Sequence, residues 1–382
     1  MSFQRKYRRQ VWRGVEKLLL TDQKMEFLQI VVIYVLLFFL SVGLYFYRDS
    51  AILRTGIVGK ICTIVSSAIR IAVPKSLTMV LYNALQYFLY TRNQCMKVLF
   101  GVLVLAGNII CIMDMLPLLY KYLPDQNHTL IPIINAFASL YFFHKCCNGD
   151  PGEITPLNLE KYQSVYPYDE RMYVPNAKCR TCKFVKPARS KHCSICNRCV
   201  HRFDHHCLWT NNDVGGLNHG YFVLFLLTMM FKCIWGFYIG IKSLVLYTQY
   251  HRLLETQVMT SNGEMKQVTS SIVLQHLFMQ FPRLVFIVTS LFFLIILLGI
   301  FTIYHVNVVL TNRTTNERYK AAELEPINID SKRLSSNKSK LQAGMKLNKN
   351  IKTVENLYDK GIIGNIYDTF WHRSIVKKIK FR

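Results

Sequence analysis

Acidic residues are scarce in this chain: 22 Asp and Glu stand against 47 Lys and Arg among 382 residues, a formal net charge of +25. Such an excess would suit a nucleic-acid-binding protein. However, the basic residues crowd into one cysteine-rich stretch and the tail beyond Thr311, a distribution typical of the cytoplasmic loops of membrane proteins. The helix pattern of a nucleic-acid-binding zinc finger is also missing, so nucleic acid is excluded as the expected partner.

The start of the chain lacks a short apolar core followed by a small-residue cleavage site, which argues against a cleaved signal peptide. Residues 28–47 are therefore expected to remain as a signal anchor. Internal repeats and low-complexity domains are also missing. The polar, lysine-rich residues 331–350 are expected to form a flexible linker between two parts of the tail.

Charges are rare in several apolar runs whose length approaches the roughly twenty residues that cross a bilayer. Two ionisable residues inside these runs, Asp114 and Lys232, are expected to face other helices, to pair with each other or to line a cavity. The runs predict membrane spans near residues 28–47, 98–120, 129–145, 221–247 and 285–309.

Residues 57–90 are also largely apolar but are interrupted by Arg70, Pro74 and Lys75. Charges are costly inside a span and inexpensive along the membrane surface. A pair of interfacial amphipathic helices is therefore favoured over an additional span, and five spans over six.

The distribution of charge also predicts which parts face the cytosol. The loops at residues 121–130 and 251–282 are nearly neutral, so the cysteine-rich stretch and the tail are placed on the cytosolic side. Asn127-His128-Thr129 then becomes a lumenal glycosylation sequon, although such sequons are common by chance. Five spans would leave the N-terminus in the lumen, whereas its basic residues favour a cytosolic start. A sixth span within residues 57–90 would remove this conflict.

Cysteine is concentrated in the stretch CRTCKFVKPARSKHCSICNRCVHRFDHHCLWTNND, which begins at Cys179 and ends at Asp213. A cytosolic face is reducing, and CxxC pairs interleaved with histidines are typical of zinc sites rather than of disulfides. Two tetrahedral sites need eight ligands. The stretch supplies seven candidate ligands in closely spaced pairs: Cys179, Cys182, His192, Cys193, Cys196, Cys199 and His206. Cys207 is left over if each site takes one histidine.

Four motifs in order carry a resemblance to a known family. Asp204-His205-His206-Cys207 lies within the cysteine-rich stretch, and Asp150-Pro151-Gly152 precedes it. Thr314-Thr315-Asn316-Glu317 follows the last span, and Asn356-Leu357-Tyr358-Asp359-Lys360-Gly361 with Asn365 lies in the tail. Together they resemble the DHHC family of integral-membrane protein S-acyltransferases, the palmitoyltransferases. The run Lys186–Cys193 and the short tail resemble its fungal Swf-type branch, which implies the endoplasmic reticulum and SNARE substrates.

The resemblance implies an interleaved assignment of the zinc ligands. The first site is expected to take Cys179, Cys182, His192 and Cys199, and the second Cys193, Cys196 and His206. The family usually has a cysteine where this chain has Asp213. A carboxylate can bind zinc, so Asp213 is the expected eighth ligand. Closure of the site by water, loss of the metal and a degraded, inactive protein remain alternatives.

Cys207 is left free by these two sites and is the expected nucleophile. A free thiol is only slightly ionised at neutral pH, so it needs a base or a neighbouring positive charge. His205 can take its proton and Asp204 can orient the imidazole, roles that the family resemblance also implies. The alternative is that Asp204 and His205 only cap the zinc fold.

The resemblance further implies that palmitoyl-CoA binds next to the zinc domain. Lys186, Arg189 and Lys191 are expected to hold the CoA phosphates, and Trp209 to cover the junction with the membrane. Cationic side chains on a cytosolic loop can equally form a solvated surface or contact anionic headgroups. The DPG and TTNE motifs are expected to be scaffolding. The tail motif is expected to dock on the membrane domain, with Tyr358, Ile362, Ile366 and Phe370 at helical spacing.

The expected fold is an all-α polytopic membrane bundle with an inserted small, loop-rich, cytosolic cysteine-rich domain that holds two structural zinc ions. Its expected parts are an N-terminal membrane region (1–147), the DPG segment with the zinc domain (148–220), a pair of spans (221–310) and a cytosolic tail (311–382). The expected function is acyl transfer from palmitoyl-CoA through Cys207 to cytosolic juxtamembrane cysteines of membrane proteins. The expected location is the membrane of the endoplasmic reticulum. A catalytically weak or inactive DHHC-like scaffold is the alternative.

Overall fold

The computed structural model describes residues 74–124, 128–259, 265–324 and 356–378. The predicted span 28–47, residues 57–73, Asn127 of the sequon and the linker 331–350 lie outside the described residues. The chain divides into two compact units. The first comprises Met1–Leu89, Ile112–Pro124 and Gly240–Phe286, and the second comprises Tyr90–Cys111, Asp125–Ile239 and Ile287–Arg382.

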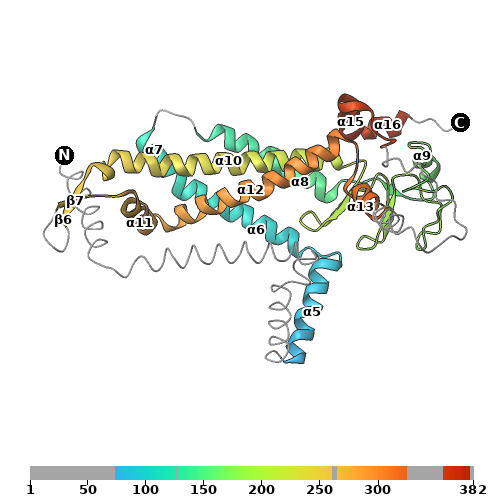
Figure 1. Ribbon diagram of the computed structural model, residues 1–382, viewed down its shortest axis with the longest axis horizontal. Coiled ribbons are helices and arrows are strands. Elements are labelled where there is room, and N and C mark those ends of the chain that lie inside the picture. Colours follow the sequence, from blue (N-terminus) through green and yellow to red (C-terminus); the bar gives the residue numbers. More distant parts are fainter. Residues whose placement is uncertain (1–73, 125–127, 260–264, 325–355, 379–382) are drawn as a thin grey trace, which may run out of the picture. The chain divides into compact units, whose positions relative to one another are not determined.

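Within the described part, four helices are long and apolar enough to cross a membrane. They match the predicted spans 98–120, 129–145, 221–247 and 285–309, so the predicted helical membrane fold is confirmed. The first run consists of α6 (Cys95–Ile110), the π-helical turn η2 (Cys111–Met115) and α7 (Leu116–Tyr122). The others are α8 (Leu130–Asn148), α10 (His219–Tyr250) and α12 (Pro282–Leu310), as seen in Figure 1.

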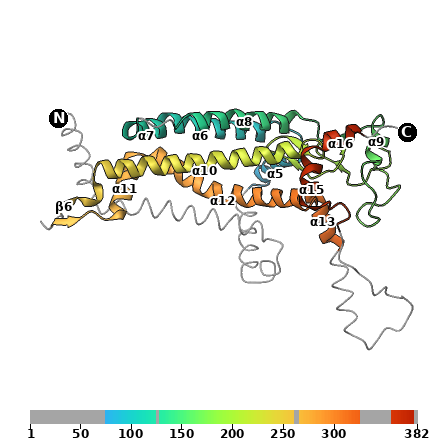
Figure 2. The same ribbon diagram turned by 90° about the horizontal axis from the view of Figure 1, so that it is seen from above.

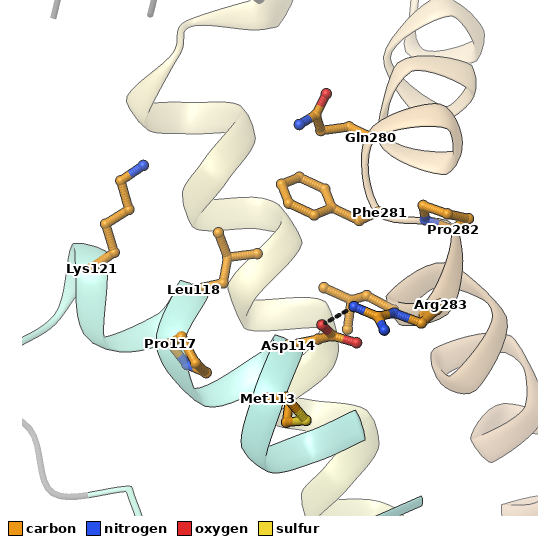
Figure 3. Close-up of a pocket in the computed structure, with 10 residues that line it drawn as sticks. Met113, Asp114, Pro117, Leu118, Lys121, Gln280, Phe281, Pro282 and Arg283 are labelled. Atoms are coloured by element: carbon orange, nitrogen blue, oxygen red, sulfur yellow. Dashed lines mark hydrogen bonds and ion pairs between the residues drawn. The ribbon is translucent and has the colours of Figure 1, made fainter. Parts of the chain in front are cut away.

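Asp114 lies in the π-helical turn η2, within the part of this turn that belongs to the first unit. Pro117 follows it and lacks the N–H that would continue regular α-helical bonding, which accounts for the wider turn. Asp114 Oδ1 accepts a hydrogen bond from Arg283 Nη2 at 2.9 Å. Figure 3 shows this ion pair near Met113 and Pro282, in a cavity of about 340 Å³ that Lys121 and Gln280 also line. Of the roles left open by the sequence, Asp114 therefore lines a cavity and pairs with the start of α12.

The first unit also contains α5 (Lys75–Tyr90) and the elements between α10 and α12. Residues of α5 are helical as predicted, and many of its apolar side chains are exposed. Its location at the membrane surface stays a prediction. Between the two long helices lie η3 (Leu253–Glu255), the antiparallel hairpin β6 (Gln257–Met259) with β7 (Met265–Gln267), and α11 (Ser270–Gln280).

The cysteine-rich module in the second unit consists of very short strands joined by long loops, as predicted. Strands β1 (Glu153–Ile154), β3 (Arg198–Val200) and β2 (Lys191–Cys193) form an antiparallel sheet in this order. Strands β4 (His205–Cys207) and β5 (Asn212–Val214) form a second pair. A short helix, α9 (Leu159–Gln163), packs on the first sheet through Tyr162. Strands of two or three residues provide little hydrophobic core, so this module depends on its cysteine and histidine clusters for cohesion.

The tail forms α13 (Thr315–Leu324), α15 (Gly361–Phe370) and α16 (His372–Lys378). Figures 1 and 2 show α15 and α16 beside the ends of α10 and α12 and the cysteine-rich module. Tyr358 is buried against Tyr166 and Tyr173, so the tail motif inserts as predicted. The expectation for Ile362 is wrong, because its side chain is 64% exposed. The helix begins only at Gly361, and its polar side is the one that is buried.

Candidate active site

The first ligand cluster brings together Cys179, Cys182, His192 and Cys199. Their ligand atoms lie within 4.8 Å of one another. His192 and Cys199 are direct partners across β2 and β3, so the sheet register brings them together. Cys182 N donates to Cys179 Sγ at 3.3 Å, which tightens the CxxC turn.

The second cluster contains Cys193, Cys196, His206 and Asp213, within the same limit of 4.8 Å. His206 and Asp213 are direct partners across β4 and β5, and His206 Nδ1 lies 2.9 Å from Asp213 Oδ1. Burial raises the pKa of Asp213. Hydrogen bonds with His206, Cys193 and Cys196 together outweigh this effect, so the pKa lies below its usual value. Asp213 is therefore an ionised carboxylate in the position of a fourth ligand.

Arg198 orients Asp213 through the carboxylate oxygen that does not contact His206. Its Nε donates to Asp213 Oδ2 at 3.3 Å, and its Nη2 donates to Asn212 Oδ1 at 2.8 Å. Asn212 Nδ2 in turn donates to the carbonyl oxygen of Cys146 at 2.9 Å, at the end of α8. These contacts tie β5, and with it the second cluster, to a membrane-spanning helix.

Consecutive side chains of a strand point to opposite faces, and this alternation separates two roles on β4. His206 faces the second ligand cluster. His205 and Cys207 share the other face, where the charge of His205 lowers the pKa of the Cys207 thiol against the effect of burial. One three-residue strand thus supplies a metal ligand on one side and a base–thiol pair on the other.

Asp204 precedes this strand and is almost fully buried. Its Oδ2 accepts from His205 Nδ1 at 2.6 Å, and its two oxygens also accept from Thr315 N at 2.7 Å and Thr315 Oγ1 at 3.1 Å. Thr315 is the first residue of α13, where backbone N–H groups favour an anion. Burial raises the pKa of Asp204. The hydrogen bond with His205 and the charges of nearby histidines outweigh burial, so the pKa lies far below its usual value. Asp204 therefore stays ionised and fixes the His205 ring.

The thiol of Cys207 lies between a polar and an apolar environment. Burial raises its pKa, but the hydrogen bond and charge of His205 outweigh burial and lower the pKa below its usual 9.0. For His205, burial lowers the pKa, whereas its bonds to Asp204 and Cys207 raise it to about 10. The apolar cluster around Cys207 contains Cys146, Val214, Phe222, Phe225 and Leu226.

Three aromatic rings extend this apolar cluster into the membrane region of the second unit. Phe100, Phe143 and Phe225 contact one another with ring centroids 5.1 to 5.8 Å apart. Trp209 contacts Phe100 edge-on at 6.3 Å and is 45% exposed. The thiol therefore lies next to an aromatic cluster supplied by α6, α8 and α10.

The expected role of Arg189 in binding CoA does not fit its position. Its side chain is fully buried, and Nε and Nη2 donate to the two carboxylate oxygens of Glu317 at 2.7 and 2.9 Å. The guanidinium also lies 4.8 Å from the centre of the Tyr166 ring and 4.4 Å from that of Tyr358. A residue so enclosed has no surface for a phosphate. Its contacts instead join the cysteine-rich module to the TTNE motif and the tail.

Lys186 is half-buried and Lys191 is exposed, and their charges act on Lys320 of α13. Burial is the main cause that lowers the pKa of Lys320, and the charges of Lys186 and Lys191 lower it as well. The carboxylates of Glu317 and Asp169 oppose these effects, and the resulting pKa is about 8. Lys320 Nζ also lies 3.9 Å from the centre of the Tyr173 ring. These three lysines form a cationic cluster, of which Lys320 was missed because it lies far away in the sequence.

Sequence reasoning also missed Arg198 and His305. The ring of His305, on α12, lies 5.3 Å from that of His205, and its Nδ1 lies 4.0 Å from Asp204 Oδ2. A lone histidine inside an apolar run gave no signal beyond its polarity. The spacing of cysteines and histidines, by contrast, gave seven of the eight cluster residues, and the resemblance to the family gave their division between the two clusters and the place of Asp213.

Two features define the class of this protein. The chain has membrane-length helices, and these are joined to a module with two metal-ligand clusters and a thiol beside a His–Asp pair. It is therefore an integral-membrane protein with a thiol site on a metal-binding module. A family model described as DHHC palmitoyltransferase matches residues 173–322. Over 251 residues the chain is 36% identical to "Palmitoyltransferase ZDHHC4" of Bos taurus, covering 65% of this chain and 72% of that protein. The chain belongs to the DHHC palmitoyltransferase family, as the sequence motifs predicted.

Two further relatives support this membership over shorter regions. The chain is 38% identical to "Palmitoyltransferase ZDHHC4" of Rattus norvegicus over 191 residues, which are 50% of this chain and just over half, 56%, of the rat protein. It is 54% identical to "Palmitoyltransferase SWF1" of Saccharomyces cerevisiae over 82 residues, 20% of this chain and 24% of the yeast protein. The predicted resemblance to the Swf-type branch is consistent with this similarity.

Proposed function

We propose that this chain is a protein S-acyltransferase that carries a long acyl group on Cys207. The thiolate attacks the carbonyl carbon of palmitoyl-CoA, the C–S bond to CoA breaks, and CoA leaves as a thiol after receiving a proton. A substrate cysteine then attacks the Cys207 thioester in the same way. Each step exchanges one thioester for another of similar free energy, which suits two-step transfer. The observation that carries the proposal is the position of the Cys207 thiol, which shares one face of β4 with His205 and lies in an apolar cluster.

His205 and Asp204 divide the proton transfer between them. His205 accepts the proton of Cys207 and returns it to the departing CoA sulfur. Asp204 holds the imidazole through Nδ1 at 2.6 Å and stabilises the imidazolium. Thr315 keeps this carboxylate in place through its N–H and hydroxyl groups.

The acyl chain is expected to lie in the apolar cluster beside Cys207. Phe222, Phe225 and Leu226 of α10 line one side, and Phe143 of α8 lies against Phe225. Each buried CH₂ group contributes about 0.8 kcal/mol, so a long chain gains substantial affinity there. Trp209, half-exposed against Phe100, is expected to cover the entrance.

The phosphates of CoA are expected to bind the lysine cluster. Lys186 and Lys191 keep the role predicted from the sequence, and Lys320 is added to it. Arg189 is removed from it because it is buried against Glu317. Charge reversal of Lys191 should raise the KM for palmitoyl-CoA more than it lowers kcat, since a phosphate contact contributes to ground-state binding.

Both ligand clusters fit structural zinc, because thiolate, imidazole and carboxylate donors converge within 4.8 Å. When bound, zinc would cross-link the loops of the module and take no part in the acyl transfer. The first cluster, Cys179 with its partners, would hold β2 to β3. The second would hold β4 to β5 through His206 and Asp213, and so fix the strand that carries Cys207.

The test is hydroxylamine-sensitive labelling of the purified protein with a clickable palmitoyl-CoA. Wild type should incorporate label, whereas Cys207→Ser should not, because the hydroxyl is far less nucleophilic. Zinc content should be the same in the two proteins, since Cys207 lies on the face of β4 opposite the ligand. Loss of one zinc equivalent in the variant would make Cys207 structural. An unlabelled wild type with full zinc content would favour the scaffold alternative.

The substrates are inferred to be membrane proteins with cytosolic cysteines next to a span, SNARE proteins among them, and the location to be the endoplasmic reticulum. The SNARE substrates and the location are what the resemblance to the Swf-type branch implies, and the chain is similar to relatives named Swf1. Membrane-protein substrates also suit a thiol that adjoins the ends of membrane-length helices. Acyl-exchange proteomics in cells with wild type or Cys207→Ser would test it. Substrates without a membrane span would contradict it.

A further inference from the structure

A cavity within the first unit is lined by both charged and apolar side chains. Its walls are η2 and α7 on one side, and the end of α11 with the start of α12 on the other, as Figure 3 shows. Asp114, Lys121 and Arg283 are its charged lining residues. Its volume of about 340 Å³ falls within the range of small-molecule sites. The proposed acyl transfer through Cys207 uses none of these side chains, so the cavity is a candidate for a separate ligand.

Asp114 has one carboxylate oxygen that is paired and one that is not. Oδ1 accepts from Arg283 Nη2 at 2.9 Å, whereas Oδ2 is buried and has no hydrogen-bond partner among the described residues. A buried acceptor without a donor is costly. The side chain is 20% exposed, and rotation about the Cβ–Cγ bond of an aspartate is soft. One oxygen can therefore accept from a donor in the cavity while the other stays with Arg283.

The two cationic residues of the cavity come from opposite walls. Arg283 belongs to α12 and Lys121 to α7. The bond to Asp114 is made by Nη2 of Arg283, and the guanidinium fork carries further N–H donors. The Arg283 side chain is 74% exposed, so these donors can reach a ligand. Two cations beside one carboxylate suit a ligand that carries a phosphate together with a positive group.

The position of the cavity along the spans indicates where such a ligand comes from. One membrane-length run ends at Tyr122 and another begins at Pro282, so the cavity lies where spans reach the headgroups. Met113, which lines the cavity, is 66% exposed. Phe286, two residues after the lining residue Leu284, is 69% exposed. These apolar side chains provide a surface for acyl chains next to the charged groups.

We propose that this cavity binds the headgroup of phosphatidylethanolamine, with the ammonium group on Asp114 and the phosphate on Arg283 and Lys121. The ammonium group supplies the N–H donor that the carboxylate lacks. Phosphatidylcholine has the same phosphate, but its quaternary nitrogen has no N–H to donate. The bound lipid would link α7 to the start of α12. This inference stands whether or not Cys207 transfers an acyl group.

The test is native mass spectrometry of the full-length protein in detergent, titrated with lipids that have identical acyl chains. Phosphatidylethanolamine should bind about tenfold more tightly than phosphatidylcholine, since a hydrogen bond to a charged group is lost. N,N-dimethyl phosphatidylethanolamine keeps one N–H and should bind with intermediate affinity. Equal affinity for the three lipids would overturn the proposal. Displacement of the lipid by an equal concentration of soluble phosphoethanolamine would overturn its assignment to a lipid.

Two variants separate the ammonium contact from the phosphate contact. In Asp114→Asn, the amide oxygen stays with Arg283 and the NH₂ group meets the ammonium, so the preference for phosphatidylethanolamine should disappear while phosphatidylcholine binds as before. Lys121→Gln, at an exposed position, should weaken binding of both lipids alike, because they share the phosphate.

Glu255→Gln is the matched control for Asp114→Asn. The Glu255 carboxylate also pairs with an arginine, Arg252, at 3.7 Å in the same unit, but lies outside the lining of the cavity. This variant should keep the preference of wild type, and the melting temperature of each variant shows that it is folded. A folded Asp114→Asn protein with the wild-type preference, or a Glu255→Gln protein without it, would contradict the proposal.

Discussion

At the scale of single residues, the two oxygens of Asp213 have different partners. Oδ1 lies 2.9 Å from His206 Nδ1 within the ligand cluster, and Oδ2 lies 3.3 Å from Arg198 Nε. The guanidinium thus holds the carboxylate in one orientation. A cysteine at this position would have no such second contact and would not need one, since a thiolate has a single ligand atom.

Asp213→Cys should therefore keep or tighten metal binding, because thiolate is the softer donor for zinc, while Asp213→Ala should lose about one zinc equivalent. Self-acylation should fall with the metal, since His206 adjoins His205. Zinc stoichiometry and labelling at equal expression check this. An Asp213→Ala protein with full metal and activity would leave water or another side chain as the fourth ligand.

Glu317 is the carboxylate partner of Arg189, and removal of one charge of a buried pair leaves the other uncompensated. We expect Glu317→Gln to destabilise the cysteine-rich module by about 3 to 5 kcal/mol. The free energy of unfolding in detergent measures this. Glu323→Gln, in the same helix but exposed, is the matched control and should change little; similar losses in both variants would contradict the argument.

At the scale of elements, the sequence predicts features that depend on residues close together in the chain, such as membrane-length helices and CxxC pairs. The apolar runs predicted the described spans, and the close pairs of cysteines predicted metal ligands, because both depend on near neighbours. The division of these ligands between two clusters came from the family resemblance, since each cluster joins residues about twenty positions apart. The burial of Arg189 could not be predicted, since its partner Glu317 lies 128 residues away. The exposed side of α15 could not be predicted either: an amphipathic pattern gives two faces without saying which one meets protein.

Docking of α16 should weaken on mild acidification. Burial lowers the pKa of His372; Asp368 opposes this, and Arg202 and Arg189 reinforce it. His372 Nε2 lies 3.0 Å from the buried His201 Nε2, and its ring stacks on Tyr166. A released tail therefore binds more protons than a docked one, so docking free energy is complete above about pH 6.5 and is lost as the pH falls below it.

Hydrogen exchange of residues 361–378 at neutral pH and at about pH 5.5 measures this loss. His372→Gln cannot be protonated there and should reduce the difference between the two conditions. Equal protection at both pH values in the wild type would show that the buried histidines do not control docking.

At the scale of the whole molecule, two spans separate the cysteine-rich module from α13. An even number of crossings returns the chain to the same side, which agrees with the packing of Glu317 on Arg189. Residues between α10 and α12 then face the other side of the membrane. A glycosylation acceptor inserted between β6 and β7 should be modified, and one inserted within residues 331–350 should not. Modification at the second position would reverse the orientation predicted from the charges.

Strand β2 has a consequence for how the module takes up metal. His192 and Cys193 are consecutive residues, yet the first belongs to one ligand cluster and the second to the other. An ion bound at either cluster therefore orders strand β2. The other ion then binds with a smaller loss of conformational entropy. Native mass spectrometry during slow chelation of the wild type should then show fewer molecules with one ion than independent loss of the two ions would give.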